Sequence, residues 1–218
     1  MDVFSLIGPV MIGPSSSHTA GAVRLGRLAR AVCGELPRAV KIQLHGSFAR
    51  TYRGHGTDLA LVAGLLDFPP DDERIPQAME RARAAGLAVS FESAELPHAH
   101  PNTARLYIQT ASQSCVITGS SPGGGEVLVT DVDGFEVELR GHYPTLLTIH
   151  QDRPGVVASV TGLLAKNEVN IARMRVSRSI RGEHALMVIE VDEPLPASLL
   201  EAAALLPGIV AARGIPPV

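Results

Sequence analysis

Residues 146–164 read LLTIHQDRPGVVASVTGLL, and this stretch decides the fold of the C-terminal part of the chain. Apolar and polar side chains alternate over residues 146–151, which predicts a β-strand with one buried face. A loop follows at residues 152–155, and from residue 156 the apolar side chains recur at helical spacing. Asp152 is expected to cap this helix, and Pro154 suits its first turn.

The following residues extend this pattern to a complete small domain. Strands are predicted near residues 169–177, 184–191 and 209–212, with a helix at 197–205 and a turn at Arg181-Gly182. The resulting order, βαββαβ, is that of the ferredoxin-like unit. The strand near residues 169–177 carries charges that we expect to be solvated at a sheet edge, namely Arg173, Arg175 and Arg178.

The N-terminal part mixes helices and strands and forms a second predicted domain. Residues 141–144 (GHYP) interrupt the pattern and separate a domain of residues 1–142 from one of residues 146–218. An Asp133-Gly134 turn between alternating runs predicts a hairpin over residues 126–140. The chain is therefore expected to have an α+β fold, with a mixed α/β domain before the ferredoxin-like one. The other predicted elements of the first domain are helices at 19–34, 57–66 and 75–85 and strands at 40–44, 89–92, 106–111 and 114–118.

The composition is that of a globular protein and excludes several classes of partner. Hydrophobic residues make up 45% of the 218 residues and charged residues 19%, which leaves enough apolar side chains for packed cores. A net charge of −3 without a large basic patch argues against nucleic-acid binding. No apolar run approaches the roughly 20 residues that cross a membrane, and the N-terminus lacks the features of a signal peptide. We therefore expect a cytoplasmic protein that binds neither nucleic acid nor membrane.

The two cysteines lie in different predicted elements. Cys33 falls in a helical pattern and Cys115 in a strand pattern, and neither belongs to a Cys-x-x-Cys pair. We interpret both as buried free thiols of a cytosolic protein, without a ligand role. No metal site is predicted in this chain.

The most specific motif is GPSSSHT at residues 13–19, which runs directly into a predicted helix. The start of a helix has unpaired N–H groups and the positive end of its dipole, so it attracts carboxylate or phosphate groups. The serine hydroxyls add hydrogen-bond donors, and His18 adds a titratable group. Because a helix cap needs only one serine or threonine, the motif favours a ligand site over a cap alone.

A second motif, GHGTD at residues 54–58, places a histidine between two glycines. The glycines predict an uncovered His55 ring and a backbone that a ligand can approach closely. Asp58 is in a position to orient His55 and stabilise its charge, which makes an imidazole a useful base. The alternative is a loop in which Thr57 or Asp58 caps the next helix and His55 is an incidental surface residue.

Two further stretches fit either a ligand site or an ordinary loop. Residues 96–105 (LPHAHPNTAR) bring together polar side chains that suit an amino acid, but the two histidines fit a metal poorly without further ligands nearby. Residues 120–125 (SSPGGG) suit an anion cradle. They lack the lysine of a P-loop and more often form a flexible turn.

Taken in order, these motifs resemble the beta subunit of iron–sulfur-dependent L-serine dehydratases, the L-serine ammonia-lyases. The resemblance is carried by residues 4–9 (FSLIGP), 12–19 (IGPSSSHT), 54–58 (GHGTD) and 100–103 (HPNT), and it departs from the family pattern at Ala104, where methionine is expected. Residues 146–171 are similar to an ACT domain, a βαββαβ module that binds small ligands, often amino acids. The N-terminal fold resembles the allosteric substrate-binding domain of some phosphoglycerate dehydrogenases.

The resemblance implies a lyase of amino-acid metabolism and gluconeogenesis that converts L-serine to pyruvate and ammonia. Its cofactor would be a [4Fe–4S] cluster rather than PLP, with one iron acting as a Lewis acid on the serine hydroxyl while a base removes the α-proton. The cluster cysteines lie on the alpha subunit of two-chain members. A chain with only two cysteines would therefore be the beta subunit, which needs that alpha chain as its partner.

The same resemblance implies roles for particular residues. His55 and His18 are the candidate acid–base groups, with His55 favoured as the base and Asp58 supporting it. An amino-acid effector would bind the ACT loop through Asp152, Arg153 and Gly155, and homodimerisation is expected. The residues expected to bind L-serine are Ser15, Ser16, Ser17, Thr19, His100, Asn102 and Thr103.

Two other interpretations compete with this one. A non-catalytic amino-acid-sensing module, as in the regulatory half of phosphoglycerate dehydrogenase, explains both domains but not two histidines in serine- and glycine-rich segments. A PLP-dependent serine dehydratase needs a Schiff-base lysine. Neither Lys41, within a strand pattern, nor Lys166, near a helix end, has a suitable context.

Overall fold

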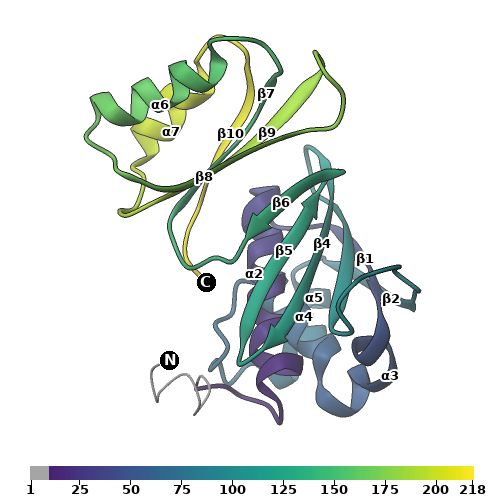
Figure 1. Cartoon of the computed structure of the whole chain (residues 1–218). Helices are drawn as coiled ribbons and strands as arrows, with labels where there is room; N and C mark the ends of the chain where they lie inside the picture. Colours follow the sequence, from purple (N-terminus) through teal and green to yellow (C-terminus); the bar gives the residue numbers. More distant parts are fainter. Residues whose placement is uncertain (1–9) are drawn as a thin grey trace. The chain divides into compact units, whose positions relative to one another are not determined.

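The computed structural model describes residues 10–218 and divides into two compact units (Figure 1). The first unit comprises the described residues up to 133 together with Val218, and the second comprises residues 134–217. The division falls within the Asp133-Gly134 turn predicted from the sequence. Residues 4–9, which contribute to the family resemblance, lie outside the described part. Within the described part, no helix is long and apolar enough to cross a membrane.

A six-stranded sheet in the order β2-β1-β3-β4-β5-β6 organises the N-terminal half of the fold. β1 and β2 are parallel, whereas β3, β4 and β5 follow as antiparallel neighbours. Residues 120–123 continue β4 instead of forming a flexible turn, because Ser120 pairs with Leu128 and Gly123 with Glu126. The strands are β1 (Ala39–Leu44), β2 (Ala88–Ser93), β3 (Thr103–Gln109), β4 (Ser114–Gly123), β5 (Glu126–Val132) and β6 (Phe135–Leu139).

One long helix, α2, packs on the sheet against β4 and β5 and buries Leu25, Leu28 and Ala29. α3 was not predicted from the sequence, because only Phe48 of its ten residues is buried and the apolar period is therefore weak. The helical segments of this unit are the wide turn η1 (Ser16–Ala20), α2 (Gly21–Cys33), α3 (Gly46–His55), α4 (Thr57–Leu65), η2 (Ile75–Gln77) and α5 (Ala78–Ala84).

After β6, the rest of the second unit has the predicted βαββαβ order, which confirms the ferredoxin-like C-terminal domain. Its sheet runs β10-β7-β9-β8, all neighbours are antiparallel, and α6 and α7 cover one face (Figure 1). Leu146, Val160 and Met187 belong to the core between helices and sheet. The elements are β7 (Thr145–Gln151), α6 (Val156–Lys166), β8 (Ile171–Arg178), β9 (His184–Val191), α7 (Ala197–Ala204) and β10 (Ile209–Ile215).

α2 and α4 approach each other at backbone distance through two glycines. A Cβ on Gly26 would lie 2.3 Å from the carbonyl oxygen of Leu61. A Cβ on Gly64 would lie 2.1 Å from the carbonyl oxygen of Val23. Neither position has room for a methyl group, so these glycines set the distance between the helices.

Gly26→Ala is therefore expected to lower the free energy of unfolding by about 1–3 kcal/mol, because overpacking outweighs the better helix propensity of alanine. Denaturant unfolding would measure the change. Gly162→Ala on α6 is the matched control, since nothing lies within 4 Å of an added Cβ there. The control should gain up to about 1 kcal/mol from propensity. Equal effects of the two substitutions would contradict the close-packing argument.

The turn between β7 and α6 lacks the Asp152 cap that was expected from the sequence. Gly155, with φ +93°, occupies the cap position, and no side chain caps α6. The carboxylate of Asp152 instead accepts hydrogen bonds from the Gly182 N–H at 3.0 Å and from Arg178 at 3.2 Å. The Gly182 N–H, and then Arg178, lower the pKa of Asp152. The prediction that Asp152 caps α6 is wrong, because this side chain ties its own turn to the one between β8 and β9.

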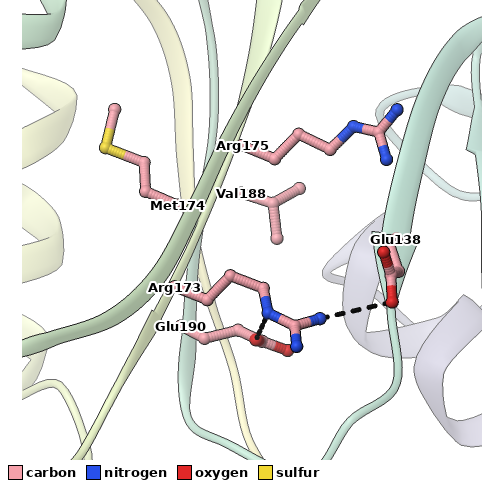
Figure 2. A pocket seen from close by; sticks show the side chains of 6 residues that line it. All are labelled: Glu138, Arg173, Met174, Arg175, Val188 and Glu190. Atoms are coloured by element: carbon pink, nitrogen blue, oxygen red, sulfur yellow. Dashed lines mark hydrogen bonds and ion pairs between the residues drawn. The ribbon is translucent and has the colours of Figure 1, made fainter.

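The arginines of β8 form ion pairs, which the expectation of solvated edge charges did not include. Arg173 lies 3.2 Å from the Glu138 carboxylate and 3.6 Å from that of the buried Glu190 (Figure 2). Arg175 lies 2.6 Å from Glu136. Arg173, Arg175, Glu138 and Glu190 help to line a cavity of about 260 Å³ in the second unit. Its arginines and glutamates are thus largely paired with one another.

His150 makes the stability of the second unit depend on pH. It is 2% exposed, and its Nδ1 has no hydrogen-bond partner in the described part of the chain. Burial is the largest influence and lowers the pKa of His150. The negative charge of Asp152 raises this pKa, but by less. Because the folded-state pKa lies below the unfolded value of about 6.5, the unfolded state binds more protons at low pH.

The free energy of unfolding should therefore fall as the pH is lowered from about 7.5 to about 5.5. His150→Gln should make this pH dependence smaller, because glutamine does not titrate in this range. Denaturant titrations of both proteins at the two pH values would test this. The same slope in wild type and variant would show that His150 does not contribute.

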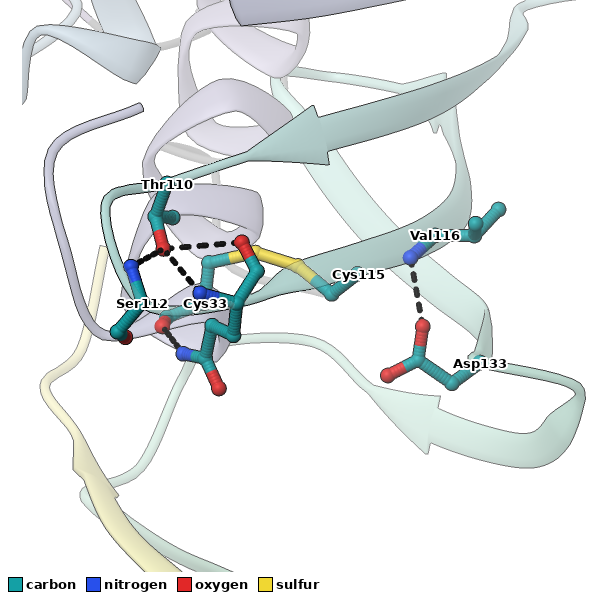
Figure 3. Close-up of a disulfide and its surroundings, with 7 residues drawn as sticks. Cys33, Thr110, Ser112, Cys115, Val116 and Asp133 are labelled. Atoms are coloured by element: carbon teal, nitrogen blue, oxygen red, sulfur yellow. Dashed lines mark hydrogen bonds between the residues drawn. A yellow bond between two sulfur atoms is a disulfide. The ribbon is translucent and has the colours of Figure 1, made fainter. Parts of the chain in front are cut away.

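Cys33 and Cys115 form a disulfide that joins the last residue of α2 to β4 (Figure 3). The prediction of free thiols is therefore wrong. The cysteines are 82 residues apart, and only the packing of α2 across β4 brings them together. The loop before Cys115 is also hydrogen-bonded, since Thr110 Oγ1 accepts from the backbone N–H groups of Ser112 and Gln113.

Candidate functional site

The serine-rich motif forms η1, the wide turn that leads into α2. Ser15 caps this turn, and its Oγ accepts a hydrogen bond from the backbone N–H of His18 at 3.2 Å. The cap turns His18 and Thr19 into the interior, where both are buried. The predicted helix start is thus present, with its histidine directed inward.

The imidazole of His18 is surrounded by three hydroxyl groups. Its Nε2 lies 3.1 Å from Ser47 Oγ. Its Nδ1 lies 3.2 Å from Ser17 Oγ and 3.3 Å from Ser15 Oγ. Burial lowers the pKa of His18, and electrostatic repulsion from the nearby His55 ring lowers it further. His18 is therefore mainly neutral at pH 7, the form that accepts a proton.

His55 is the last residue of α3, and its ring packs against that of His18. The ring centroids are 4.8 Å apart, with an angle of 67° between the planes. The ring is half-buried against His18 instead of uncovered. Its Nδ1 is buried, and no hydrogen-bond partner for it lies among residues 10–218. Gly56, with φ +67°, forms the turn between α3 and α4.

Asp58 does not bond to the Nδ1 of His55. Its carboxylate accepts a hydrogen bond from the Leu59 N–H at 2.9 Å, within the first turn of α4. The cap position of α4 is Gly56, and neither Thr57 nor Asp58 acts as a side-chain cap. The predicted support of His55 by Asp58 is therefore not a direct hydrogen bond to this nitrogen.

The third motif is held beside the start of α3 by its backbone. The carbonyl oxygen of Pro101 accepts from the Ser47 N–H at 2.8 Å. Asn102 exchanges two hydrogen bonds with Ser121, one through its side-chain amide at 3.1 Å and one through its carbonyl at 3.0 Å. These bonds bring the loop of residues 100–103 between α3 and β4. Thr103 Oγ1 donates to the carbonyl oxygen of His100 at 2.6 Å.

Several buried polar atoms around η1 have no hydrogen-bond partner in the described structure. A buried polar atom without a partner costs about 1–3 kcal/mol, so a group of them marks a place where a ligand can complete the bonding. They lie on η1, α2, α3, α4 and β4, and η1 packs against the other four. The atoms are Thr19 Oγ1, Arg24 Nε, His55 Nδ1, Thr57 Oγ1 and Ser121 Oγ.

Three residues of this region were not among the predicted substrate-binding or catalytic residues. Ser47 contacts His18 from the unpredicted helix α3. Ser121 packs on the start of α2, where a Cβ on Gly21 would lie only 1.9 Å from its Oγ. Arg24, one turn into α2, donates to the carbonyl oxygen of Gly125 at 2.8 Å. The SSPGGG stretch at residues 120–125 indicated a candidate ligand site that includes Ser121, whereas no sequence motif surrounds Ser47.

The described residues do not fit the ligand set of an iron–sulfur cluster. Within residues 10–218, no three His, Cys, Asp or Glu side chains are grouped to hold a metal ion. Both cysteines are joined in the disulfide. The ACT-loop residues Asp152, Arg153 and Gly155 lie in the turn before α6, in the second unit.

Comparisons with known proteins identify both parts of the chain. Residues 1–132 match the family described as serine dehydratase beta chain, and residues 145–204 match the ACT domain. The chain is 46% identical over 208 residues to the "Probable L-serine dehydratase, beta chain" of Bacillus subtilis, covering 95% of this chain and 94% of the relative. It is 39% identical over 201 residues to the "L-serine dehydratase, beta chain" of Peptoniphilus asaccharolyticus, covering 91% and 90%.

A more distant relative has a different name. D-3-phosphoglycerate dehydrogenase of Archaeoglobus fulgidus is 28% identical over 194 residues, which cover 87% of this chain and 36% of the relative. This similarity agrees with the expected fold of the N-terminal domain. The family model matches residues 1–132, and two relatives align over nearly their full length. The chain therefore belongs to the serine dehydratase beta chain family and carries a C-terminal ACT domain.

Proposed function

We propose that this chain is the beta subunit of an L-serine dehydratase, which deaminates L-serine to pyruvate and ammonia together with an alpha subunit that carries a [4Fe–4S] cluster. The observation that carries the proposal is the contact between His18 and His55 beside the start of α2, among buried polar atoms that have no hydrogen-bond partner in the described part of the chain. The names of the beta-chain relatives support the substrate and the reaction.

The start of η1, which continues directly into α2, provides the means to hold the carboxylate of L-serine. The positive end of the dipole lies here, and the first N–H groups of η1 have no partner within the helix, whereas the Gly21 N–H of α2 already donates to the Ser16 carbonyl oxygen. The hydroxyls of Ser16 and Thr19 add donors in the same segment, whereas those of Ser15 and Ser17 are directed at His18 Nδ1. The loop with His100, Asn102 and Thr103 is held beside α3 and β4, which suits a role in orienting the substrate.

The two histidines provide a place for the α-proton. A proton-transfer group works best when its pKa is close to the working pH, and imidazole meets this condition. His55 is the proposed base, and the neutral ring of His18 packs against it. Asp58, which has no hydrogen bond to His55 Nδ1, would act through its charge alone.

The described residues do not fit the ligand set of the cluster, so we propose that the cluster ligands lie on the alpha chain. The proposed reaction uses no PLP on either chain. The ACT domain supports two further parts of the proposal, an amino-acid effector at the Asp152, Arg153 and Gly155 turn and pairing with a second copy. A cytoplasmic location fits this metabolic role.

A non-catalytic sensing module is the second candidate, favoured by the phosphoglycerate dehydrogenase similarity that extends over both domains. Co-expression of the full chain with a tagged, cysteine-bearing alpha chain of the family separates the two. We expect equimolar co-purification and iron in the complex but not in the isolated chain. An isolated chain that binds iron, or that never associates with the alpha chain, would contradict the beta-subunit proposal.

A further inference from the structure

Ser47 connects the segments of the candidate site. It lies in the first turn of α3, where its backbone N–H is not used by the helix and donates to Pro101 of the third motif at 2.8 Å. Its Oγ lies 3.1 Å from Nε2 of His18 in the first motif. The other end of α3 carries His55. One residue thus contacts two motifs and shares a helix with the third.

The hydroxyls on the other side of His18 favour a proton on Nε2 over one on Nδ1. Ser15 Oγ already accepts from the backbone N–H of His18, so its own O–H is left to donate. The acceptors within reach are His18 Nδ1 at 3.3 Å and Ser17 Oγ at 3.4 Å. If Ser15 donates to Ser17, the Ser17 hydroxyl can donate to Nδ1 over 3.2 Å. In each arrangement a hydroxyl within 3.3 Å can donate to Nδ1, which favours the form with the lone pair on this nitrogen.

A neutral imidazole has one N–H and one lone pair, so a lone pair on Nδ1 requires a proton on Nε2. That N–H points at Ser47 Oγ. We infer that Ser47 is a positioning residue: it accepts a hydrogen bond from the Nε2–H of His18 and holds this ring in a single tautomer and orientation against His55. The inference rests on the proposed function and extends it, because it names the residue that fixes the His18 ring beside His55.

The role of Ser47 follows from the surroundings of His18. Phe48 packs edge-on against the ring, with centroids 5.3 Å apart, and His55 packs on it at 4.8 Å. Neither ring contact includes a described hydrogen bond to His18, so neither favours one tautomer over the other. Without the Ser47 oxygen, the Nε2–H would lose its described acceptor, and the competing Nδ1–H form would gain population.

Nitrogen-15 NMR of the histidine rings in the full chain tests the inference without any activity. Protonated and unprotonated ring nitrogens have well-separated shifts, so the tautomer is read directly. We expect a protonated Nε2 for wild-type His18 near pH 7.5 and averaged shifts for both nitrogens in Ser47→Ala. Ser47→Thr keeps the hydroxyl and should retain the wild-type shifts. A protonated Nδ1 in the wild type, or unchanged shifts in Ser47→Ala, would overturn the inference.

Kinetics of the complex with the alpha chain give the second readout. Loss of an outer hydrogen-bond partner commonly costs about 10–100-fold, so Ser47→Ala should lower kcat by this factor and change KM by less than about threefold. Ser47→Thr should restore most of kcat. Ser90→Ala, on the exposed part of β2, is the matched control for loss of a serine hydroxyl.

The two readouts separate failure of the inference from failure of the proposed function. Unchanged kcat in Ser47→Ala, in a complex that turns over serine, would overturn the positioning role. A wild-type complex without serine turnover would overturn the proposed function, while the NMR experiment would still decide the tautomer.

Discussion

His55→Ala in the complex with the alpha chain is expected to lower the turnover of L-serine by about 10²–10⁴-fold, the usual contribution of a general acid or base. The ring of His55 lies against the neutral His18 beside the helix start that is proposed to hold the carboxylate. No other described histidine shares this contact. Turnover would be followed as pyruvate formation, with the iron content measured in the same preparation.

The iron content should stay at the wild-type level, because the described residues of this chain do not fit the cluster. His184→Ala is the matched control, since His184 is exposed at the start of β9. Wild-type turnover in His55→Ala would exclude His55 as the base.

A double variant shows whether the two histidines act as a unit. Residues that act together in one proton-transfer step give strongly non-additive effects. His18→Ala with His55→Ala should therefore lose little more than the more damaging single variant. Fully additive losses would mean that the ring contact has no functional consequence.

Removal of the Cys33–Cys115 disulfide is expected to lower the free energy of unfolding by about 4.5 kcal/mol. The estimate follows from the loop-closure entropy of cysteines 82 residues apart. The double variant Cys33→Ala with Cys115→Ala avoids leaving a free thiol. Denaturant unfolding with and without a reductant would measure the effect.

The reductant provides the control for the disulfide experiment. It should destabilise the wild-type protein but leave the double variant unchanged. Alkylation of the denatured protein should modify two cysteines only after reduction. Two reactive thiols without reductant, or equal stability of the oxidised wild type and the variant, would contradict a stabilising disulfide.

The C-terminal domain and the first motif could be predicted because their signals are local. Alternation in residues 146–151 and helical spacing after residue 156 define β7 and α6 without reference to the remaining chain. The serine-rich motif likewise precedes its own helix, and Ser15 acts as a cap there. The local sequence and the fold agree at these points.

The features that escaped prediction depend on contacts between distant segments. α3 has a weak apolar period and is placed by Gly46, whose added Cβ would lie 2.7 Å from the Pro101 carbonyl oxygen. The disulfide forms only where α2 packs on β4, and the Ser47–His18 contact forms only where α3 packs beside η1. Asp152 looked like a cap, but a backbone N–H from the turn after β8 offered a partner. Tertiary contacts decide each of these cases.

Pyruvate formation from L-serine, measured for the alpha chain alone, this chain alone and the purified complex under anaerobic conditions, tests the central claim most directly. A beta subunit that supplies the substrate-holding helix start and the histidine pair predicts activity only in the complex. An iron-loaded alpha chain that is fully active alone, or an iron-loaded complex that forms no pyruvate, would contradict it.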